Sequence, residues 1–483
     1  MTFVSIEYHL FLFAILFFYY LFPIKYRWLV LLAGNFSFYW VAGKGGRKMF
    51  LAMVLLSYLC GIFVEKLRQK SSLRLQRIGL WASLILISIP LLTFKEGNYL
   101  IQRYLHRSGW SFIAPLGLSF FTVQIIAYLV DIYHQKITAE KNPLKYALFI
   151  SFFPQIVQGP IPRYNQLAPQ LLEGHRFTSQ NITYGLHLIL WGFFLKFVIA
   201  DKAAVLVNTV FDRPDLYKGV YVLVAGSLYS LQLYADFQAC TKLAQGAAML
   251  FGIRLTNNFN HPYFSRSIKE FWGRWHISFS SCLKDYVYIP LGGNRKGRLR
   301  KYINLLITFL VSGAWHGSGY RFLVWGGLHG IYQILGDFTL PTRKKLYSAL
   351  GFSAYSPIRH CLQSLSTFFL TTIAWIIFRA DSLQKAISMI VSIFTVRNPW
   401  VLFNDSIFSL GLSWKEFLIL ICSLGILFLV SLKQEQGISI SQTILKQPLI
   451  IRWTIYTLTV IVVAVFGTYG FGFNAQDFIY GGF

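Results

Sequence analysis

The chain has 483 residues, of which 55% are hydrophobic, 18% aromatic and 13% charged. That charged fraction is about half of what an average soluble domain carries, so the composition excludes a disordered or fibrous protein and argues against a soluble enzyme. The formal net charge is +27, from 45 lysines and arginines against 18 aspartates and glutamates. In so apolar a chain we expect this excess to lie beside anionic membrane lipid, and not on nucleic acid, for which no recognition motif is present.

Apolar runs recur along the whole chain and predict membrane helices. They lie at residues 10–22, 28–41, 51–64, 78–94, 112–132, 182–200, 220–233, 243–255, 303–315, 322–335, 365–378, 417–432 and 453–466. A full span needs about 20 residues, and shorter runs are typical of broken or re-entrant helices that line a cavity. We therefore predict an all-α polytopic membrane protein with about 11 to 13 spans, folded as one membrane domain over residues 1–483.

Two basic clusters indicate which loops face the cytoplasm. Five lysines and arginines lie within residues 66–77, and five more lie within residues 294–301. The positive-inside rule predicts that both loops are cytoplasmic. Counting back three spans from the first cluster places the N-terminus outside.

A polar stripe runs along the segment 303–315 and ends just beyond it. Its members are spaced four residues apart, on one side of a helix: Asn304, Thr308, Ser312 and His316. Such a stripe faces a wet cavity or another helix, not lipid. It either supplies hydrogen bonds between helices or presents His316 as a catalytic or proton-handling group. His329, in the next segment, could approach His316 and is better explained as a structural partner.

The stretch 257–293 is a second candidate site, because charges and aromatic rings interrupt it too often for a clean span. Residues 265–283 predict an amphipathic helix at the membrane interface, with His276 on it. An interfacial anchor explains the charges and rings but not the histidine. The basic loop 295–301 that follows is a topology signal, a surface that steers an anionic cofactor tail such as the phosphates of coenzyme A, or both.

Familiar soluble-enzyme motifs are absent from the sequence, including Walker A, G-x-S-x-G and H-E-x-x-H. Asp131, Asp201 and Asp236 lie near segment ends and form no obvious carboxylate pair. The five cysteines are far apart, and no set of metal ligands is visible. We therefore expect no metal.

Two tryptophan–histidine motifs stand out, WGRWHISFSSCLKDYVYIPLGGNRKG (272–297) and VSGAWHGSGYRFLVWGGLHG (311–330). They closely resemble the membrane-bound O-acyltransferase family, nearest its bacterial alginate and peptidoglycan O-acetyltransferases. Further similar stretches are PLGLSFFTVQIIAYLVDIY (115–133), SFFPQIVQGPIPRYNQLAPQL (151–171), IIFRADS (376–382) and FIYGGF (478–483). The resemblance covers about residues 1–483 and is densest in an expected catalytic core at 115–382. One departure is DFQACTKLAQG (236–246), where the family commonly has a pattern like D-F-S-G-Y-S-D-M-A.

The resemblance implies a ring of tilted helices around a thin core that is pierced by a funnel. It also implies that His316 matches the family's active-site histidine and that His276 matches the second histidine. We expect the acyl donor to be bound by residues in and between the two motifs: Trp275, Arg274, Lys284, Arg295, Lys296, Trp315, Asn304 and Ser312.

The implied function is O-acetylation in the bacterial cytoplasmic membrane. Acetyl-CoA would be the cytoplasmic donor, and the acceptor would be an extracytoplasmic polysaccharide such as alginate or peptidoglycan, reached directly or through an SGNH-type partner transferase. His316 would be the general base, and His276 would position the donor or stabilise the oxyanion. Two alternatives stay open: D-alanyl transfer to teichoic acid by the same fold, and a transporter or channel with His316 as a proton site.

Overall fold

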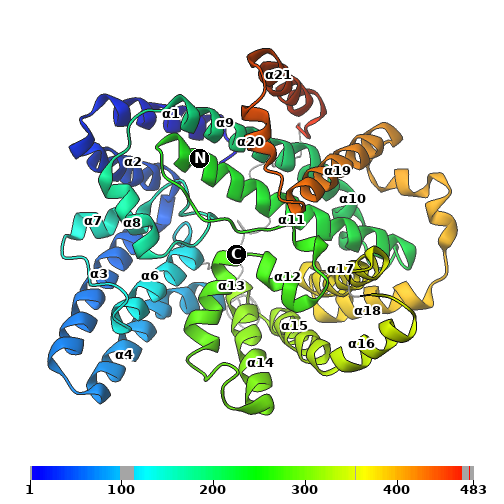
Figure 1. Cartoon of the computed structure of the whole chain (residues 1–483), viewed down its shortest axis with the longest axis horizontal. Coiled ribbons are helices and arrows are strands. Elements are labelled where there is room, and N and C mark those ends of the chain that lie inside the picture. Colours follow the sequence, from blue (N-terminus) through cyan, green and yellow to red (C-terminus); the bar gives the residue numbers. More distant parts are fainter. Residues whose placement is uncertain (1–2, 98–113, 354, 470–477, 479–483) are drawn as a thin grey trace. The chain divides into compact units, whose positions relative to one another are not determined.

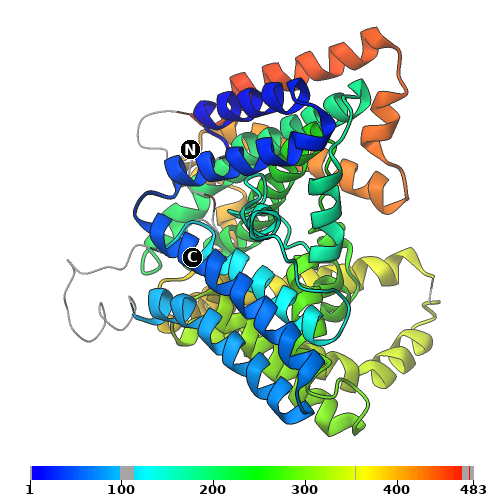
Figure 2. The ribbon, with the colours of Figure 1, turned by 90° about the vertical axis from the view of Figure 1, so that its left-hand side faces the viewer.

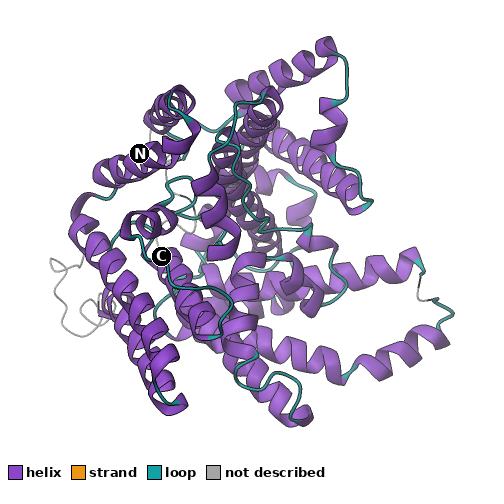
Figure 3. Cartoon of the chain, turned by 60° about the vertical axis from the view of Figure 1, so that its left-hand side comes forward, coloured by secondary structure: helices purple, strands orange, loops and turns teal. Residues whose placement is uncertain are grey.

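The structure, a computed structural model, describes residues 3–97, 114–353, 355–469 and 478. Every regular element in these ranges is a helix (Figure 3). This confirms the predicted all-α class, and each predicted apolar run falls largely on a helix. Residues 112–113 of one predicted run, and all of the FIYGGF stretch except Phe478, lie outside the described residues.

The chain divides into two compact units. The first comprises residues 1–189, 240–257 and 476–483. Its helices are α1 (Ile6–Leu21), α2 (Arg27–Ala42), α3 (Arg47–Lys70), α4 (Leu73–Leu92), α6 (Leu118–Tyr133), α7 (Pro143–Ser151) and α8 (Tyr164–Glu173) (Figure 1). Helices α3 and α4 pack as an antiparallel pair (Figure 2). The basic cluster 66–77 therefore flanks the turn that joins them.

The second unit comprises residues 190–239 and 258–475. Its longer helices are α10 (Asp201–Asp212), α14 (Gly297–His316), α15 (Tyr320–Phe338), α16 (Leu340–Ala349), α17 (Pro357–Arg379), α18 (Leu383–Thr395), α19 (Trp414–Glu435) and α21 (Leu449–Phe466). Its shorter helices are α12 (Ile268–Arg274), α13 (Ile277–Leu283) and α20 (Ile440–Leu445). Helices α9 (Ser179–Phe193) and α11 (Val220–Leu250) contribute residues to both units. The single membrane domain stays a prediction.

Six helical segments of the described chain are long and apolar enough to cross a membrane: Arg47–Lys70, Leu73–Gly97, Ser179–Asp212, Pro357–Arg379, Trp414–Glu435 and Leu449–Phe466. Shorter apolar helices lie at Ile6–Leu21, Leu118–Tyr133 and Leu383–Thr395. The runs 220–233 and 243–255 differ from expectation, because α11 covers the first and most of the second. The predicted total of spans includes broken helices and stays a prediction.

Helices α14 and α15 pack with their backbones in contact. A Cβ atom on Gly313 would clash with the carbonyl oxygen of Phe322, and one on Gly326 would clash with that of Phe309. The absence of side chains at the two glycines lets the helices approach this closely. This contact places His316, the last residue of α14, close to the first turns of α15.

Candidate active site

The backbone breaks at His276, where the sequence predicts one continuous helix over 265–283. That prediction is wrong: α12 ends at Arg274, α13 begins at Ile277, and His276 between them has φ +46°. Asn258 holds the break, because its carbonyl accepts from the Ile277 amide at 2.9 Å and its Oδ1 accepts from the Ser278 hydroxyl at 2.6 Å. A left-handed histidine that its neighbours hold in place is typical of a functional site.

The two predicted catalytic histidines share aromatic neighbours. The His316 ring lies 5.6 Å from the Phe279 ring and 4.8 Å from the Trp315 ring, between centroids. The His276 ring lies 5.0 Å from Phe279 and 6.1 Å from Trp315. Both imidazoles are buried, with exposed fractions of 1% for His276 and 2% for His316. The structure therefore brings the two motifs together around one pair of rings.

His329 extends this cluster on the α15 side. Its Nδ1 accepts a hydrogen bond from the indole Nε1–H of Trp272 at 3.2 Å, so a neutral His329 carries its proton on Nε2. The Trp325 ring lies 5.0 Å from His316 and 5.1 Å from His329. His329 thus approaches His316 through a shared tryptophan, in agreement with a structural role.

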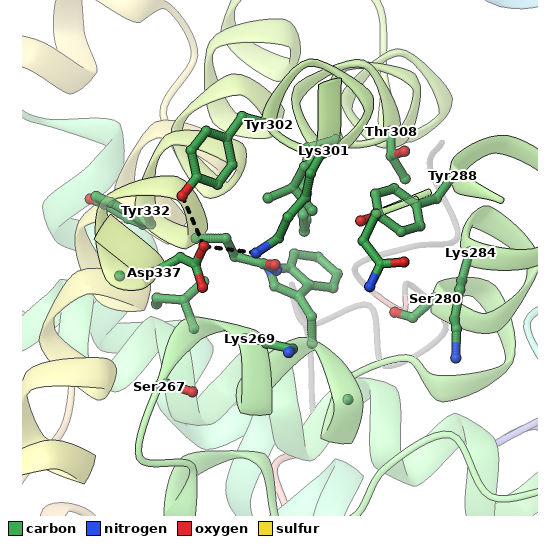
Figure 4. Close-up of a pocket in the computed structure, with 18 of the residues that line it drawn as sticks. Ser267, Lys269, Ser280, Lys284, Tyr288, Lys301, Tyr302, Thr308, Tyr332 and Asp337 are labelled. Carbon is green, nitrogen blue, oxygen red and sulfur yellow. Dashed lines mark hydrogen bonds and ion pairs between the residues drawn. The ribbon is translucent and has the colours of Figure 1, made fainter. Parts of the chain in front are cut away.

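A cavity of about 950 Å³ opens beside the cluster (Figure 4). Its walls come from α12, α13, the loop 289–295, α14 and α15, with contributions from α16 and α17. Trp272 lines it, and so do Ile277 and Ser280, which lie on either side of Phe279 in α13. The two predicted catalytic histidines are not among its lining residues. They lie behind this wall, and Trp272 connects the cavity to the cluster through His329 and Trp325.

The cavity is strongly basic. Six of its lining residues are lysines or arginines: Arg266, Lys269, Lys284, Arg295, Lys301 and Arg343. Figure 4 shows Lys284 and Ser280 on one side and Lys301 on the other. An anionic ligand would be attracted here, since cations around a low-dielectric hollow raise the local concentration of anions.

Of the residues predicted to bind a donor, Lys284 and Arg295 line this cavity. The remaining predicted residues lie elsewhere in the second unit: Trp275, Arg274, Lys296, Trp315, Asn304 and Ser312. Sequence reasoning did not single out Lys301 and Arg343 as ligands. Lys301 ends the basic cluster 294–301, so its position was a signal that could have found it. Nothing in the local pattern marks Arg343.

Two of the predicted donor residues have evident structural contacts. Arg274 pairs with Glu435 at 2.6 Å and with Glu270 at 2.7 Å. Asn304 is buried, and its Nδ2 donates to the Gly293 carbonyl at 2.9 Å. The polar stripe on α14 therefore serves in part to bind the loop that contains Gly293 to the helix.

A buried ion cluster lies elsewhere in the second unit. Lys196 contacts Asp201 at 2.8 Å and Asp236 at 2.9 Å, and all three side chains are at most 5% exposed. The sequence showed no obvious carboxylate pair, and the structure corrects this, because the two carboxylates share one ammonium group. A π-helical segment at Phe194–Ala200 carries the lysine.

Comparison with known proteins identifies the family of this chain. Residues 135–371 match the model of MBOAT, the membrane-bound O-acyltransferase family. The chain is 34% identical to a peptidoglycan O-acetyltransferase of Helicobacter pylori over 396 residues, which cover 75% of this chain and 72% of the relative. It is 33% identical to the probable alginate O-acetylase AlgI of Pseudomonas aeruginosa, covering 78% and 71%. A teichoic acid D-alanyltransferase of Bacillus subtilis is 30% identical, covering 53% and 67%.

The range that matches the family model, 135–371, includes both tryptophan–histidine motifs of this chain. The two O-acetyl-transfer relatives match over 75% and 78% of the chain. Together with the apolar helices, they make this a multi-pass membrane-bound enzyme. The chain therefore belongs to the membrane-bound O-acyltransferase family and is an O-acyltransferase.

Proposed function

We propose that the chain moves an acetyl group from cytoplasmic acetyl-CoA to an extracytoplasmic polysaccharide, in the bacterial cytoplasmic membrane. The observation that carries this proposal is the basic cavity beside the imidazole cluster, with Trp272 in contact with both. Relatives named for O-acetyl transfer match over three quarters of this chain, whereas a relative named for D-alanyl transfer matches over 53% of it. This difference favours acetyl as the transferred group.

The size and charge of the cavity suit a coenzyme A thioester. Its volume of about 950 Å³ is near the upper end of the range of about 300–1,000 Å³ for small-molecule sites. The phosphates would contact the lysines and arginines, since these side chains form charge-assisted hydrogen bonds with phosphate oxygens. Arg295 and Lys301 belong to the basic cluster 294–301, for which the positive-inside rule predicts the cytoplasmic side.

The chemistry follows from two buried imidazoles. His316 takes the proton of an acceptor hydroxyl, and the oxygen attacks the thioester carbonyl carbon. When the carbon–sulfur bond breaks, the proton on His316 passes to the leaving thiolate. His276 has its pKa lowered to about 3 by burial, so at neutral pH it is uncharged and can donate one N–H to the developing oxyanion. The rings of Trp315 and Phe279 would exclude water that competes with the acceptor.

The acceptor hydroxyl belongs either to the polysaccharide or to a separate SGNH-type transferase that passes the acetyl group on. Relatives named for alginate and for peptidoglycan match to a similar extent, so the polysaccharide is tested by supplying each one. An assay with and without the partner distinguishes direct transfer from relay.

The experiment measures release of labelled acetate or acetylated product from acetyl-CoA by the purified protein in lipid nanodiscs. We expect His316→Ala to lower turnover by about 10²–10⁴-fold, the usual contribution of a general base. His134→Ala serves as the matched control, because His134 is exposed at the end of α6. Full activity of a correctly folded His316→Ala protein would refute the assignment.

A second candidate is D-alanyl transfer from a carrier protein, which the match to the teichoic acid enzymes favours. The donor discriminates between the two, because coenzyme A brings its own phosphates to the cavity and a carrier protein must dock on the surface around it. Turnover of a D-alanyl carrier with no turnover of acetyl-CoA would select this candidate.

A further inference from the structure

A single carboxylate stands among the cations of the cavity. Asp337 is the one acidic residue among the described residues that line it, against six lysines and arginines. A carboxylate lowers the local positive potential, so it weakens the attraction of the cavity for an anionic donor. The position of Asp337 therefore needs an explanation of its own.

Asp337 holds two groups that would otherwise face the ligand. Its Oδ2 accepts from the Lys301 ammonium at 2.7 Å and from the Tyr302 hydroxyl at 2.9 Å (Figure 4). Both donors are at the start of α14, and Asp337 is near the end of α15. These two hydrogen bonds lower the pKa of Asp337, so the carboxylate stays charged at neutral pH.

The contact is exposed enough to be exchanged. The side chain of Lys301 is 32% exposed and that of Asp337 is 42% exposed, and ion pairs in such positions are held weakly. A phosphate group presents more negative charge and more acceptor oxygens than a carboxylate, so it can compete for the same two donors. A small monoanion has no such advantage.

We propose that Asp337 is a specificity residue that occupies Lys301 and Tyr302 until a phosphate group of the donor displaces it. This inference rests on the proposed function. It adds that Asp337 makes binding depend on a phosphate group in the donor. In the absence of a donor, Asp337 keeps small anions from the two groups. When the donor binds, Lys301 and Tyr302 transfer their hydrogen bonds to the phosphate, and Asp337 turns to solvent.

The competing explanation is a clamp between α14 and α15. A clamp predicts that loss of the carboxylate loosens the helix pair and weakens donor binding. Displacement predicts tighter donor binding instead, because loss of the Asp337 carboxylate frees Lys301 and Tyr302 to bind phosphate. The dissociation constant for coenzyme A therefore separates the two explanations, and the melting temperature shows whether the helix pair has loosened.

The test compares coenzyme A binding to the full-length protein in nanodiscs for wild type, Asp337→Asn and Asp337→Glu, by calorimetry at low salt. We expect Asp337→Asn to bind about five-fold more tightly, from the loss of one nearby negative charge in a partly screened site. The gain should shrink at high salt, and KM for acetyl-CoA should fall while kcat stays within two-fold. Asp337→Glu keeps the charge and should restore the wild-type constant. Asp405→Asn, an exposed acid outside the cavity lining, is the control for net charge.

Each result decides the matter. Equal or weaker binding by a folded Asp337→Asn protein, with wild type binding coenzyme A, overturns the inference and leaves the proposed donor in place. No binding of coenzyme A by wild type overturns the donor and this inference together. If Asp337→Asn does not fold, inorganic pyrophosphate and acetate are compared on wild type. Competition with coenzyme A by pyrophosphate at least ten-fold better than by acetate supports displacement, and equal competition contradicts it.

Discussion

The buried Lys196 forms ion pairs with two carboxylates, those of Asp201 and Asp236. The two carboxylates share one ammonium group there. Lys196 and Asp201 lie in a helical segment apolar enough to span a membrane, and Asp236 lies in α11. Removing one member of a buried ion pair is usually costly, because the charge that stays behind loses its partner. Replacing either carboxylate of this cluster should therefore have a different effect on stability from replacing the lysine.

We predict that Lys196→Met lowers the free energy of unfolding by about 3–5 kcal/mol, since it leaves two buried carboxylates without their cation. Asp201→Asn should cost less, because Lys196 and Asp236 then form a neutral pair. Thermal and denaturant unfolding in detergent would measure both. Lys385→Met removes an exposed pair with Asp381 and should change stability by no more than about 0.5 kcal/mol. A larger loss for Asp201→Asn than for Lys196→Met would contradict this assignment of charge.

Single residues were predictable where a local pattern marked them. His316 ended a stripe of four-residue spacing, and His276 stood in an unusual aromatic setting, so the sequence singled out both. Their catalytic roles stay a prediction. The partners of Lys196 and Asp337 were not found. Asp236 is 40 positions from Lys196 along the chain, and Asp337 is 36 from Lys301. Only the packing of helices brings such pairs together.

At the scale of elements, two adjacent glycines in α15 offer an internal comparison. A Cβ atom on Gly326 would clash with the Phe309 carbonyl, whereas one on Gly327 meets nothing nearer than a Leu310 methyl carbon at 3.7 Å. We predict that Gly326→Ala destabilises the protein by about 1–3 kcal/mol, the usual cost of overpacking. It should also lower turnover, because Trp325 beside it contacts both His316 and His329.

Gly327→Ala is the control for this pair. It should be neutral or stabilise α15 by up to about 1 kcal/mol, because alanine is the better helix former. Melting temperatures and turnover of the two variants would be measured side by side. Equal effects of the two substitutions would show that helix propensity, and not the contact with α14, governs this segment.

Most helices could be predicted, because an apolar run in the sequence indicates a membrane helix. The interruptions could not. Charges at 265–283 were compatible with one amphipathic helix. The break at His276 depends on hydrogen bonds that Ile277 and Ser278 donate to Asn258, which no local pattern reveals. In α11 the error was the opposite one. Polar residues such as Asp236, Gln238 and Lys242 separate the two apolar runs, but the helix continues through them. Apolar runs report lipid contact and burial, and continuity of the helix is a separate property.

For the molecule as a whole, orientation in the membrane decides whether the basic cavity can meet a cytoplasmic donor. The cluster 66–77 lies at the turn between α3 and α4, and the cluster 294–301 precedes and begins α14. Lysine and arginine excess keeps loops on the cytoplasmic side during insertion. Both clusters should therefore be cytoplasmic, and Arg295 and Lys301 of the second cluster also line the cavity.

We predict that cysteines placed at Arg74 and Arg298 react with a membrane-impermeant maleimide only after bacterial cells are opened. Both positions are exposed, so the reagent can reach them once it is inside. The background variant carries Cys361→Ser and Cys422→Ser, because these two native cysteines are exposed, whereas Cys60, Cys240 and Cys282 are buried. Labelling of Arg298→Cys in intact cells would place the cavity mouth outside, and cytoplasmic acetyl-CoA could not then reach it. Labelling of Arg74→Cys alone in intact cells would instead separate the two clusters and require an odd number of spans between them.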